Sequence, residues 1–248
     1  MIELRNVSKS FNGKKVLDRI NLTIEEGSTT VIIGGSGQGK SVILKHIIGL
    51  MKPDEGEILY KGKDITKISD FELNEIRKEF GFLFQFAALF DSMTVEENVG
   101  FPLRENTKMK ESEIREIVRQ RLLDVGLKDV EDKMPSELSG GMQRRVGLAR
   151  ALAMSPKTII YDEPTTGLDP ILSDTINTLI RDTQKKFGVT SIVSSHDIPG
   201  MFKIADKVAL IYNTKIHFFG TTEELRNCKD PYVIQFLSGS SEGPAKVI

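Results

Sequence analysis

The sequence predicts an α/β fold, in which short buried strands alternate with helices. Residues 30–33 form a β-branched apolar run that is typical of a buried strand. Residues 42–50 follow with helical spacing of their apolar side chains and no helix breaker before Gly49. Residues 158–163 form a second apolar run that ends in two adjacent carboxylates. These three segments indicate a sheet with helices packed against it.

Residues 34–41, between that first strand and helix, read Gly-Gly-Ser-Gly-Gln-Gly-Lys-Ser and match the pattern G-x-x-x-x-G-K-[ST]. Glycines let successive backbone N–H groups curve around phosphate oxygens, and the following helix directs its positive end at the same charge. Lys40 is expected to reach the β- and γ-phosphates, and the Ser41 hydroxyl to ligate Mg²⁺. A glycine-rich turn before a core helix is the alternative, but every fixed position of the pattern is filled. The loop is predicted to bind a nucleoside triphosphate through Gly34, Gly35, Ser36, Gly37, Gln38, Gly39, Lys40 and Ser41.

Composition excludes several function classes. The chain has 248 residues with 34 Lys and Arg against 35 Asp and Glu, which gives no electrostatic case for nucleic-acid binding. Its single cysteine, Cys228, excludes an internal disulfide and fits a reducing compartment. The N-terminus lacks the apolar core of a signal peptide, and no window approaches the about 20 apolar residues that a membrane span requires. We therefore expect a soluble, cytoplasmic chain that binds no nucleic acid.

The N-terminal segment, residues 1–24, alternates as strands do around a turn at 12–15 and predicts an antiparallel β region. Phe11 lies immediately before that turn. It is either a half-buried aromatic of the hairpin or a platform on which an adenine ring stacks, and residue type alone leaves both interpretations open.

After the phosphate loop and its helix, residues 57–60 predict a short strand, and residues 81–84 predict a core strand. A helix is expected between them, over 70–78, with three residues on its apolar side: Phe71, Leu73 and Ile76. Gln85 stands at the C-terminal end of the second strand, where ligands collect in open α/β sheets. It is either a plain strand terminus or a ligand to Mg²⁺ or the attacking water.

From about residue 91 to residue 154 the pattern changes to helices with dense charge. One helical face carries the apolar residues Ile114, Ile117, Val118, Leu122 and Val125, and the intervening charges form its solvated side. We expect a helical subdomain over 91–154, inserted into an α/β core formed by 1–90 and 155–238. Together they make a single nucleotide-binding domain over 1–238. The small, polar residues 239–248 are expected to form a flexible tail.

Residues 138–143 read Leu-Ser-Gly-Gly-Met-Gln and open a further helix. A serine and two glycines at a helix start offer a hydroxyl and unobstructed N–H groups, which suits an anion. Simple N-capping by Ser139 is the alternative. Because two glycines cost helix stability, a functional reason is favoured, and Ser139, Gly140 and Gly141 become candidate phosphate-binding residues.

The acidic residues that follow the strand at 158–163 are candidates for metal binding and catalysis. Asp162 suits coordination of Mg²⁺ through a water, and Glu163 suits the general base that polarises the attacking water. Acidic residues often terminate strands, but a pair that follows a phosphate loop favours the functional interpretation. Asp169 precedes a helix over 171–186 and is either its cap or a nucleotide contact.

His196 is one of three histidines and follows a β-branched strand over 189–194. A buried structural histidine is the usual alternative. The position at the end of a strand favours a contact to the γ-phosphate. Residues 208–212 and 215–219 predict a closing hairpin.

The ordered set of phosphate loop, Gln85, residues 138–143, the acidic pair and His196 resembles the ATP-binding subunits of ABC transporters over nearly the whole chain. The resemblance implies a P-loop NTPase core of the ABC ATPase type. It also implies a head-to-tail homodimer that holds two ATP molecules, each between the phosphate loop of one subunit and Ser139-Gly140-Gly141 of the other. Phe11 would take the adenine-stacking position, and Val42 stands where many members carry a second hydroxyl.

The same resemblance implies a role for each catalytic candidate. Lys40, Gln85, Glu163 and His196 are the expected catalytic residues. Mg²⁺ would be held by Ser41, Gln85 and Asp162, and Asp169 would contact the nucleotide.

Within that family, residues 39–50, 83–99 and 101–105 look like the ATPase of Mla/Mce-type phospholipid transporters. Those systems pair the ATPase with a separate integral membrane permease and a lipid-binding Mce protein at a two-membrane envelope, and some add a small STAS-domain protein. The resemblance implies an ATPase peripheral on the inner face of the cytoplasmic membrane, with a permease helix received beside Gln85 at Phe86, Leu89 and Phe90.

Three other functions compete with that interpretation. Within the family, the transporter could carry a substrate other than phospholipid. A soluble ABC ATPase of translation would carry two cassettes on one chain, and one of DNA repair would carry a long coiled-coil insertion, whereas this chain has one phosphate loop and no heptads. A small-molecule P-loop kinase would need neither residues 138–143 nor a base placed to activate water.

Overall fold

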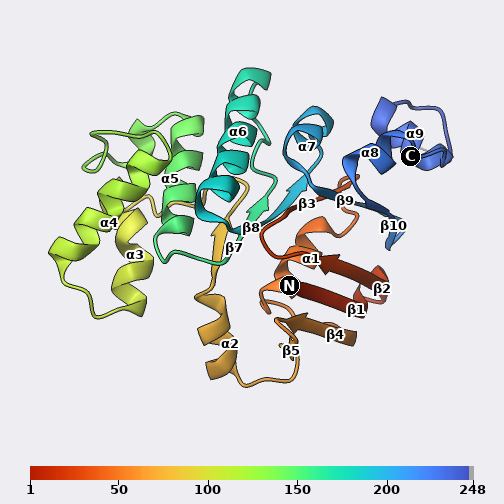
Figure 1. The fold of residues 1–248 in the computed structure, drawn as a ribbon, viewed down its shortest axis with the longest axis horizontal. Helices are drawn as coiled ribbons and strands as arrows, with labels where there is room; N and C mark the ends of the chain where they lie inside the picture. Colours follow the sequence, from red (N-terminus) through yellow and green to blue (C-terminus); the bar gives the residue numbers. More distant parts are fainter. Residues whose placement is uncertain (246–248) are drawn as a thin grey trace. The chain divides into compact units, whose positions relative to one another are not determined.

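The structure, a computed structural model, describes residues 1–245 (Figure 1). The chain divides into two compact units. The first unit comprises Met1–Ser69 together with the chain from Val193 onward, and the second comprises Asp70–Ile192. The strand β8 (Thr190–Ser195) begins in the second unit and ends in the first.

The first unit contains a four-stranded antiparallel sheet in the order β2-β1-β4-β5. Its strands are β1 (Ile2–Phe11), β2 (Lys14–Ile24), β4 (Glu55–Tyr60) and β5 (Lys63–Asp64). Asn12 and Gly13 connect β1 to β2 with φ angles of 49° and 76°. Two left-handed residues of this type suit a tight hairpin turn. The predicted N-terminal antiparallel region is confirmed.

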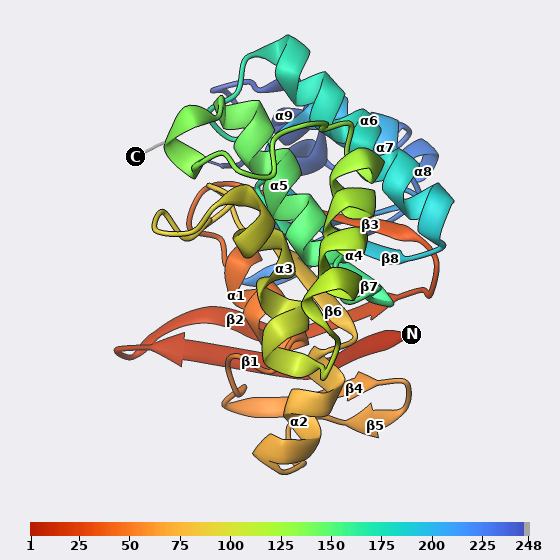
Figure 2. The same ribbon diagram turned by 90° about the vertical axis from the view of Figure 1, so that its left-hand side faces the viewer.

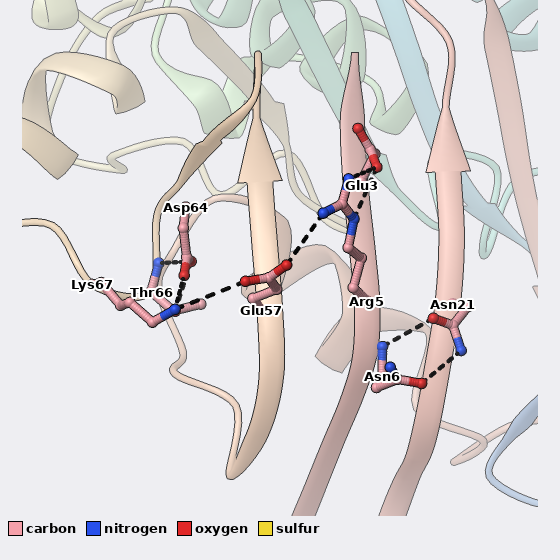
Figure 3. Close-up of polar contacts among 8 residues, drawn as sticks. All are labelled: Glu3, Arg5, Asn6, Asn21, Glu57, Asp64, Thr66 and Lys67. Atoms are coloured by element: carbon pink, nitrogen blue, oxygen red, sulfur yellow. Dashed lines mark hydrogen bonds and ion pairs between the residues drawn. The ribbon is translucent and has the colours of Figure 1, made fainter.

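Polar contacts run across the exposed face of that sheet (Figure 3). Arg5 on β1 donates to Glu3 Oε2 at 2.7 Å and to Glu57 Oε1 on β4 at 3.3 Å. Lys67 then lies 3.8 Å from Glu57 and 2.8 Å from Asp64. Solvent-exposed ion pairs of this kind stabilise a sheet only weakly, so the stability of the sheet depends on its buried face.

A bulge in β1 lies next to these contacts. Asn6 has φ 51°, and its N–H donates to Asn21 Oδ1 on β2 at 3.0 Å (Figure 3). Gly56 lies against the bulge, where a Cβ would collide with the carbonyl oxygens of Arg5 and Asn6. The close approach of β4 to the bulge therefore requires glycine at this position.

Three further strands of the first unit, β3 (Thr29–Gly34), β9 (Lys207–Tyr212) and β10 (Lys215–Gly220), pair with one another, and β3 runs into the phosphate loop. β3 is buried along its whole length and pairs in parallel with β9, which pairs antiparallel with β10. The predicted closing hairpin is therefore present. The helices of this unit are α1 (Lys40–Ile47), α7 (Ile198–Ile204), α8 (Thr222–Arg226) and α9 (Pro231–Ser238).

In the second unit, β6 (Phe80–Leu83) pairs in parallel with β7 (Thr158–Asp162). Its helices are α2 (Asp70–Arg77), α3 (Val95–Asn106), α4 (Glu111–Asp124), η1 (Pro135–Glu137), α5 (Gly140–Leu152) and α6 (Pro170–Phe187). Figure 2 shows α3, α4 and α5 side by side. These helices lie within the span predicted for the helical subdomain, although the limits of that subdomain and of the single domain stay predictions.

Helix α5 packs very closely on β6 because glycines face the contact. A Cβ at Gly81 would lie 2.5 Å from the carbonyl oxygen of Ala151. A Cβ at Gly147 would lie 2.8 Å from Cδ1 of Leu83. The backbone of α5 is thus held directly against the strand that precedes Gln85.

The predicted apolar side of the helix over 70–78 is wrong in one residue. Leu73 is buried, but Phe71 is 76% exposed. Residues two apart do not share a helix face, so Phe71 cannot accompany Leu73 into the core.

The predicted flexible tail, residues 239–248, stays a prediction. Gln235 on α9 donates to the carbonyl oxygens of Ser240 and Ala245 at 3.3 and 2.9 Å, and accepts from the Ala245 N–H at 2.8 Å. Residues 246–248 of that tail lie outside the part described.

Candidate functional site

The glycine loop of the first unit connects β3 to α1. Two of its glycines lie so close to neighbouring strands that a side chain there would collide with them. At Gly34, with φ 154°, a Cβ would lie 2.8 Å from the carbonyl oxygen of Ile211 on β9. At Gly39, with φ 96°, it would lie 3.0 Å from Cδ2 of Leu17 on β2. The two ends of the loop therefore approach β9 and β2 too closely for a side chain, and a glycine-rich loop before a helix fits the phosphates of a nucleotide.

Lys40 is the first residue of α1 and is only 5% exposed. Its ammonium group donates to the carbonyl oxygens of Gly34 and Gly35 at 3.0 and 3.2 Å. The loop thus holds the ammonium group of Lys40, which is predicted to bind phosphate, by two hydrogen bonds. An ammonium group together with the N–H groups of a helix start forms an electropositive site for an anion.

Two other predicted residues of the first unit lie at strand ends. Phe11 ends β1, is 40% exposed, and has the ammonium group of Lys9 at 5.8 Å from its ring centroid. His196 follows β8 and is exposed, which rules out the buried structural histidine. Asp197 then caps α7 by accepting from the Gly200 N–H at 3.0 Å.

The second unit carries Gln85 in a loop that follows β6 and that an arginine holds in place. Ala87 and Ala88 have φ 60° and 46°. Arg150 on α5 donates to their carbonyl oxygens at 2.7 and 2.8 Å. Arg150 is half-buried, and this burial lowers the pKa of its guanidinium group. Two left-handed residues in succession are costly, and these hydrogen bonds stabilise them.

The acidic pair lies at the end of β7, as the sequence predicts. Asp162 is the last residue of the strand. Glu163 has φ 47°, and its Oε2 accepts a hydrogen bond from the Thr166 hydroxyl at 3.0 Å. A glutamate in the left-handed region is unusual, and such conformations concentrate at functional sites. The hydroxyl of Thr166 fixes the orientation of the carboxylate.

The start of α5 presents the predicted anion site. Ser139 is the N-cap and accepts from the Met142 N–H at 3.3 Å, and both Ser139 and Gly140 are exposed. Gln143 donates to the Pro135 carbonyl oxygen at 2.9 Å, which fixes the chain before the helix. Ser139 therefore does cap the helix, and the phosphate-binding role of these residues stays a prediction.

Asp169 caps α6, which was one of its two interpretations. Its Oδ1 accepts from the N–H groups of Ile171 and Leu172 at 2.9 and 3.0 Å. The predicted nucleotide contact of Asp169 remains a prediction.

The predicted Mg²⁺ ligands lie at three places along the chain: Ser41 in α1, Gln85 after β6 and Asp162 at the end of β7. Hydroxyl, amide and carboxylate oxygens are ligands that Mg²⁺ accepts, so the donor chemistry fits this ion. Within residues 1–245, no three His, Cys, Asp or Glu side chains are grouped as a metal site.

Sequence reasoning missed Thr166, Arg144 and Arg150. Both arginines belong to a helix that carries three arginines among mostly small and apolar residues, and this is the available sequence signal. Nothing in the sequence indicates which carbonyl oxygens they reach.

A glycine loop that encloses a lysine after a buried strand, with an acidic pair ending another strand, defines a P-loop nucleotide-binding protein. A sequence model described as ABC transporter matches residues 17–166. The chain belongs to the ABC transporter family, and it is an ATPase of that family.

Relatives with printed functions cover nearly the whole chain. The intermembrane phospholipid transport system ATP-binding protein MlaF of Haemophilus influenzae is 44% identical over 99% of this chain and 93% of its own length. A probable ribonucleotide transport ATP-binding protein, mkl, of Mycobacterium tuberculosis is 44% identical over 98% of this chain and 68% of its own. The chloroplastic protein TRIGALACTOSYLDIACYLGLYCEROL 3 of Arabidopsis thaliana is 43% identical over 99% and 76%.

Solved structures show the same fold. A dimeric bacterial ABC transporter cassette aligns with a TM-score of 0.82 at 33% identity, covering 89% of this chain and 98% of its own. The cbiO1 part of the cbiONQ transporter complex from Clostridium perfringens aligns with a TM-score of 0.84 at 33% identity over 92% and 91%. The predicted fold class is confirmed.

Proposed function

We propose that this chain is the ATP-hydrolysing subunit of an ABC transporter that moves phospholipid across a two-membrane cell envelope. The observation that carries the substrate class is the 44% identity, over nearly the full length of both chains, to an ATP-binding protein of intermembrane phospholipid transport. A relative of equal identity named for ribonucleotide transport makes ribonucleotide the second candidate substrate.

The proposed mechanism assigns each side chain one physical task. Lys40 and the N–H groups of the glycine loop bind the phosphates and stabilise the charge that develops on them. Glu163, oriented by Thr166, accepts the proton of the attacking water, and His196 contacts the γ-phosphate. Ser41, Gln85 and Asp162 would hold Mg²⁺, which supplies further neutralisation of phosphate charge when bound.

The proposed assembly is a homodimer that two ATP molecules hold together. Ser139, Gly140 and Gly141 of one copy would contact the γ-phosphate bound in the phosphate loop of the other. The exposure of Ser139 and Gly140 at the start of α5 and the dimeric state of a similar cassette support this arrangement.

An integral membrane permease is the proposed second partner. The second unit has an apolar groove of about 430 Å³ whose walls include Phe80, Phe82, Phe84, Phe90, Phe101 and Met154. Phe90 belongs to this groove, whereas Phe86 and Leu89, the other predicted docking residues, are not among its lining residues. A permease helix seated here would cover Phe84 and Phe90, which are 43% and 42% exposed.

The proposed location of the chain is the surface of a membrane. Within the described part of the chain, no helix combines the length and apolar character that crossing a bilayer requires. We place the chain on the inner face of the cytoplasmic membrane through its permease, with an Mce-domain lipid-binding protein and a small STAS-domain protein as further members of the complex.

The decisive variant is Glu163→Gln. Glutamine keeps the volume of the side chain and an oxygen for the Thr166 hydroxyl but cannot accept a proton. The variant should bind ATP, fail to hydrolyse it, and accumulate as an ATP-dependent dimer detectable by light scattering at high protein concentration. Adding Ser139→Arg should reverse the dimer. Hydrolysis at the parental rate would show that another group is the base.

The substrate class is tested on the complex that co-purifies with the chain from membranes. Phospholipid should be present in the complex and should stimulate its ATPase activity, whereas ribonucleotides other than the hydrolysed ATP and its product ADP should do neither. If these ribonucleotides stimulate the ATPase activity and phospholipid does not, ribonucleotide is the transported substrate.

A further inference from the structure

Arg144 is a buried cation next to the predicted phosphate-binding residues. It lies in the second turn of α5 and is 6% exposed. Burial lowers its pKa. Among the residues that the structure describes, no carboxylate forms an ion pair with it. A guanidinium group stays charged in proteins, and burying a charge without an ion-pair partner costs stability. The contacts that Arg144 makes must therefore offset this cost.

The guanidinium group of Arg144 joins two functional segments through main-chain oxygens. Its Nη1 donates to the carbonyl oxygen of Gly140, the first residue of α5, at 3.3 Å. Its Nη2 donates to the carbonyl oxygen of Thr166, which lies between β7 and α6. Its Nε is buried without a hydrogen-bond partner. One side chain thus fixes the distance between the Ser139-Gly140-Gly141 segment and the loop after Glu163.

Thr166 extends this connection to the catalytic carboxylate. While its carbonyl oxygen accepts from Arg144, its hydroxyl donates to Glu163 Oε2 at 3.0 Å. The path from Gly140 to Glu163 therefore consists of hydrogen bonds through Arg144 and Thr166, all within one unit.

The neighbouring arginine provides a comparison. Arg145 also donates to a main-chain oxygen, that of Val125 after α4, at 2.9 Å. That bond joins α5 to α4 and does not touch the loop at 165–167. Arg145 therefore resembles Arg144 in charge and in its contact with a carbonyl oxygen, but it lacks a connection to Glu163.

We propose that Arg144 is a positioning residue for ATP hydrolysis, which aligns Glu163 through Thr166 according to the position of the Ser139-Gly140-Gly141 segment. The inference rests on the proposed roles of Glu163 and of that segment. In the proposed dimer each copy contacts one ATP through its phosphate loop and the other ATP through Ser139. Arg144 then couples the two nucleotide sites within a single chain.

The test compares four single variants and one double variant, Arg144→Met with Thr166→Val, of the full-length chain by steady-state ATP hydrolysis. Arg144→Met removes both bonds at similar length, and Arg144→Lys keeps the charge but not the two-pronged donor. Thr166→Val removes only the hydroxyl. Arg145→Met is the matched control. Thermal unfolding and nucleotide binding are measured for each variant to establish that it is folded.

Arg144→Met and Thr166→Val should each lower kcat by about 10- to 100-fold with KM for ATP changed less than about twofold, since a misaligned base loses part of its 10²–10⁴-fold contribution. Arg144→Lys should recover part of the rate. The double variant should fall little below either single variant, because both interrupt one path. Arg145→Met should stay within about twofold of the parent.

Three results would overturn the inference. The loss of kcat in the double variant could equal the product of the two single losses, or the substitutions could change KM alone. Arg144→Met and Arg145→Met could also lower kcat equally. If both Arg144 variants fail to fold, the residue serves stability alone and the inference is also overturned. If the parent chain does not hydrolyse ATP, the proposed function is overturned as well. If the parent hydrolyses ATP and one of the results above is found, only the inference about Arg144 is overturned.

Discussion

The guanidinium group of Arg150 donates a hydrogen bond of 2.7 Å to the carbonyl oxygen of Ala87. This contact joins the C-terminal part of α5 to the loop that contains Gln85. Arg144 makes the corresponding connection at the other end of the helix. Helix α5 thus contacts both the loop that contains Gln85 and the loop that follows Glu163.

Replacement of Arg150 by Met should destabilise the protein. The buried Ala87 loses the donor to its carbonyl oxygen, which typically costs about 1–3 kcal/mol, whereas the exposed Ala88 loses a donor that water can replace. Urea unfolding followed by circular dichroism measures the change. Arg119→Met, on the exposed face of α4, is the control and should change the free energy of unfolding by less than about 0.5 kcal/mol. Equal effects of the two variants would mean that the loop does not depend on Arg150.

Much of the fold follows from local patterns in the sequence. The β-branched runs became β3, β7 and β8 within one or two residues of the predicted limits. Three short helices, α7, α8 and α9, were not predicted. Each begins at a capping residue, Asp197, Thr221 or Asp230, but none is long enough for apolar periodicity to be recognised.

The candidate site could be predicted only in part. Lys40, Glu163 and Ser139 were identified because glycine spacing, strand ends and helix starts are visible in one dimension. The contacts of Arg144 with Thr166 and of Arg150 with Ala87 join residues 22 and 63 positions apart. Such contacts depend on how α5 packs, and local sequence carries no information on that packing.

Lys40→Ala should abolish most ATP hydrolysis and leave the fold intact. The loss of one electrostatic contact to the reacting phosphate lowers rates by about 10²–10³-fold. Lys45→Ala, at an exposed position of the same helix, should retain the parental rate. A phosphate-release assay with both variants measures this, and an unchanged rate in Lys40→Ala would refute the assignment of the loop.

Phe84→Asp together with Phe90→Asp should release the chain from its permease and preserve nucleotide binding. Both rings line the apolar groove, and burying such a side chain contributes about 1.5–3 kcal/mol. Phe86→Asp is the control, since Phe86 is 69% exposed and does not line the groove. Co-purification from membranes distinguishes these variants. Release by Phe86→Asp alone would place the docking surface outside the groove.

His46 should make the stability of the protein depend on pH. The imidazole on α1 is fully buried, its Nδ1 lies 2.7 Å from the Val42 carbonyl oxygen, and its Nε2 has no hydrogen-bond partner. Burial lowers the pKa of His46, the bond to Val42 opposes that change, and the charge of Lys9 adds to the lowering. The folded protein therefore keeps this histidine neutral at a pH where the unfolded chain protonates it.

The sign of the effect follows from proton linkage. Above the pKa of an unfolded histidine, about 6.5, both states are neutral at this position and the stability does not depend on it. As the pH falls from about 6.5 toward the lowered folded value, the unfolded state binds more protons, so the free energy of unfolding decreases by up to about 1.4 kcal/mol per pH unit. His46→Asn, which keeps a donor near Nδ1, should show a smaller decrease between pH 8 and pH 5.5 in urea unfolding. His196→Asn, at an exposed histidine, should show the parental decrease. If His46→Asn retains the full decrease, other groups cause it and the buried histidine does not.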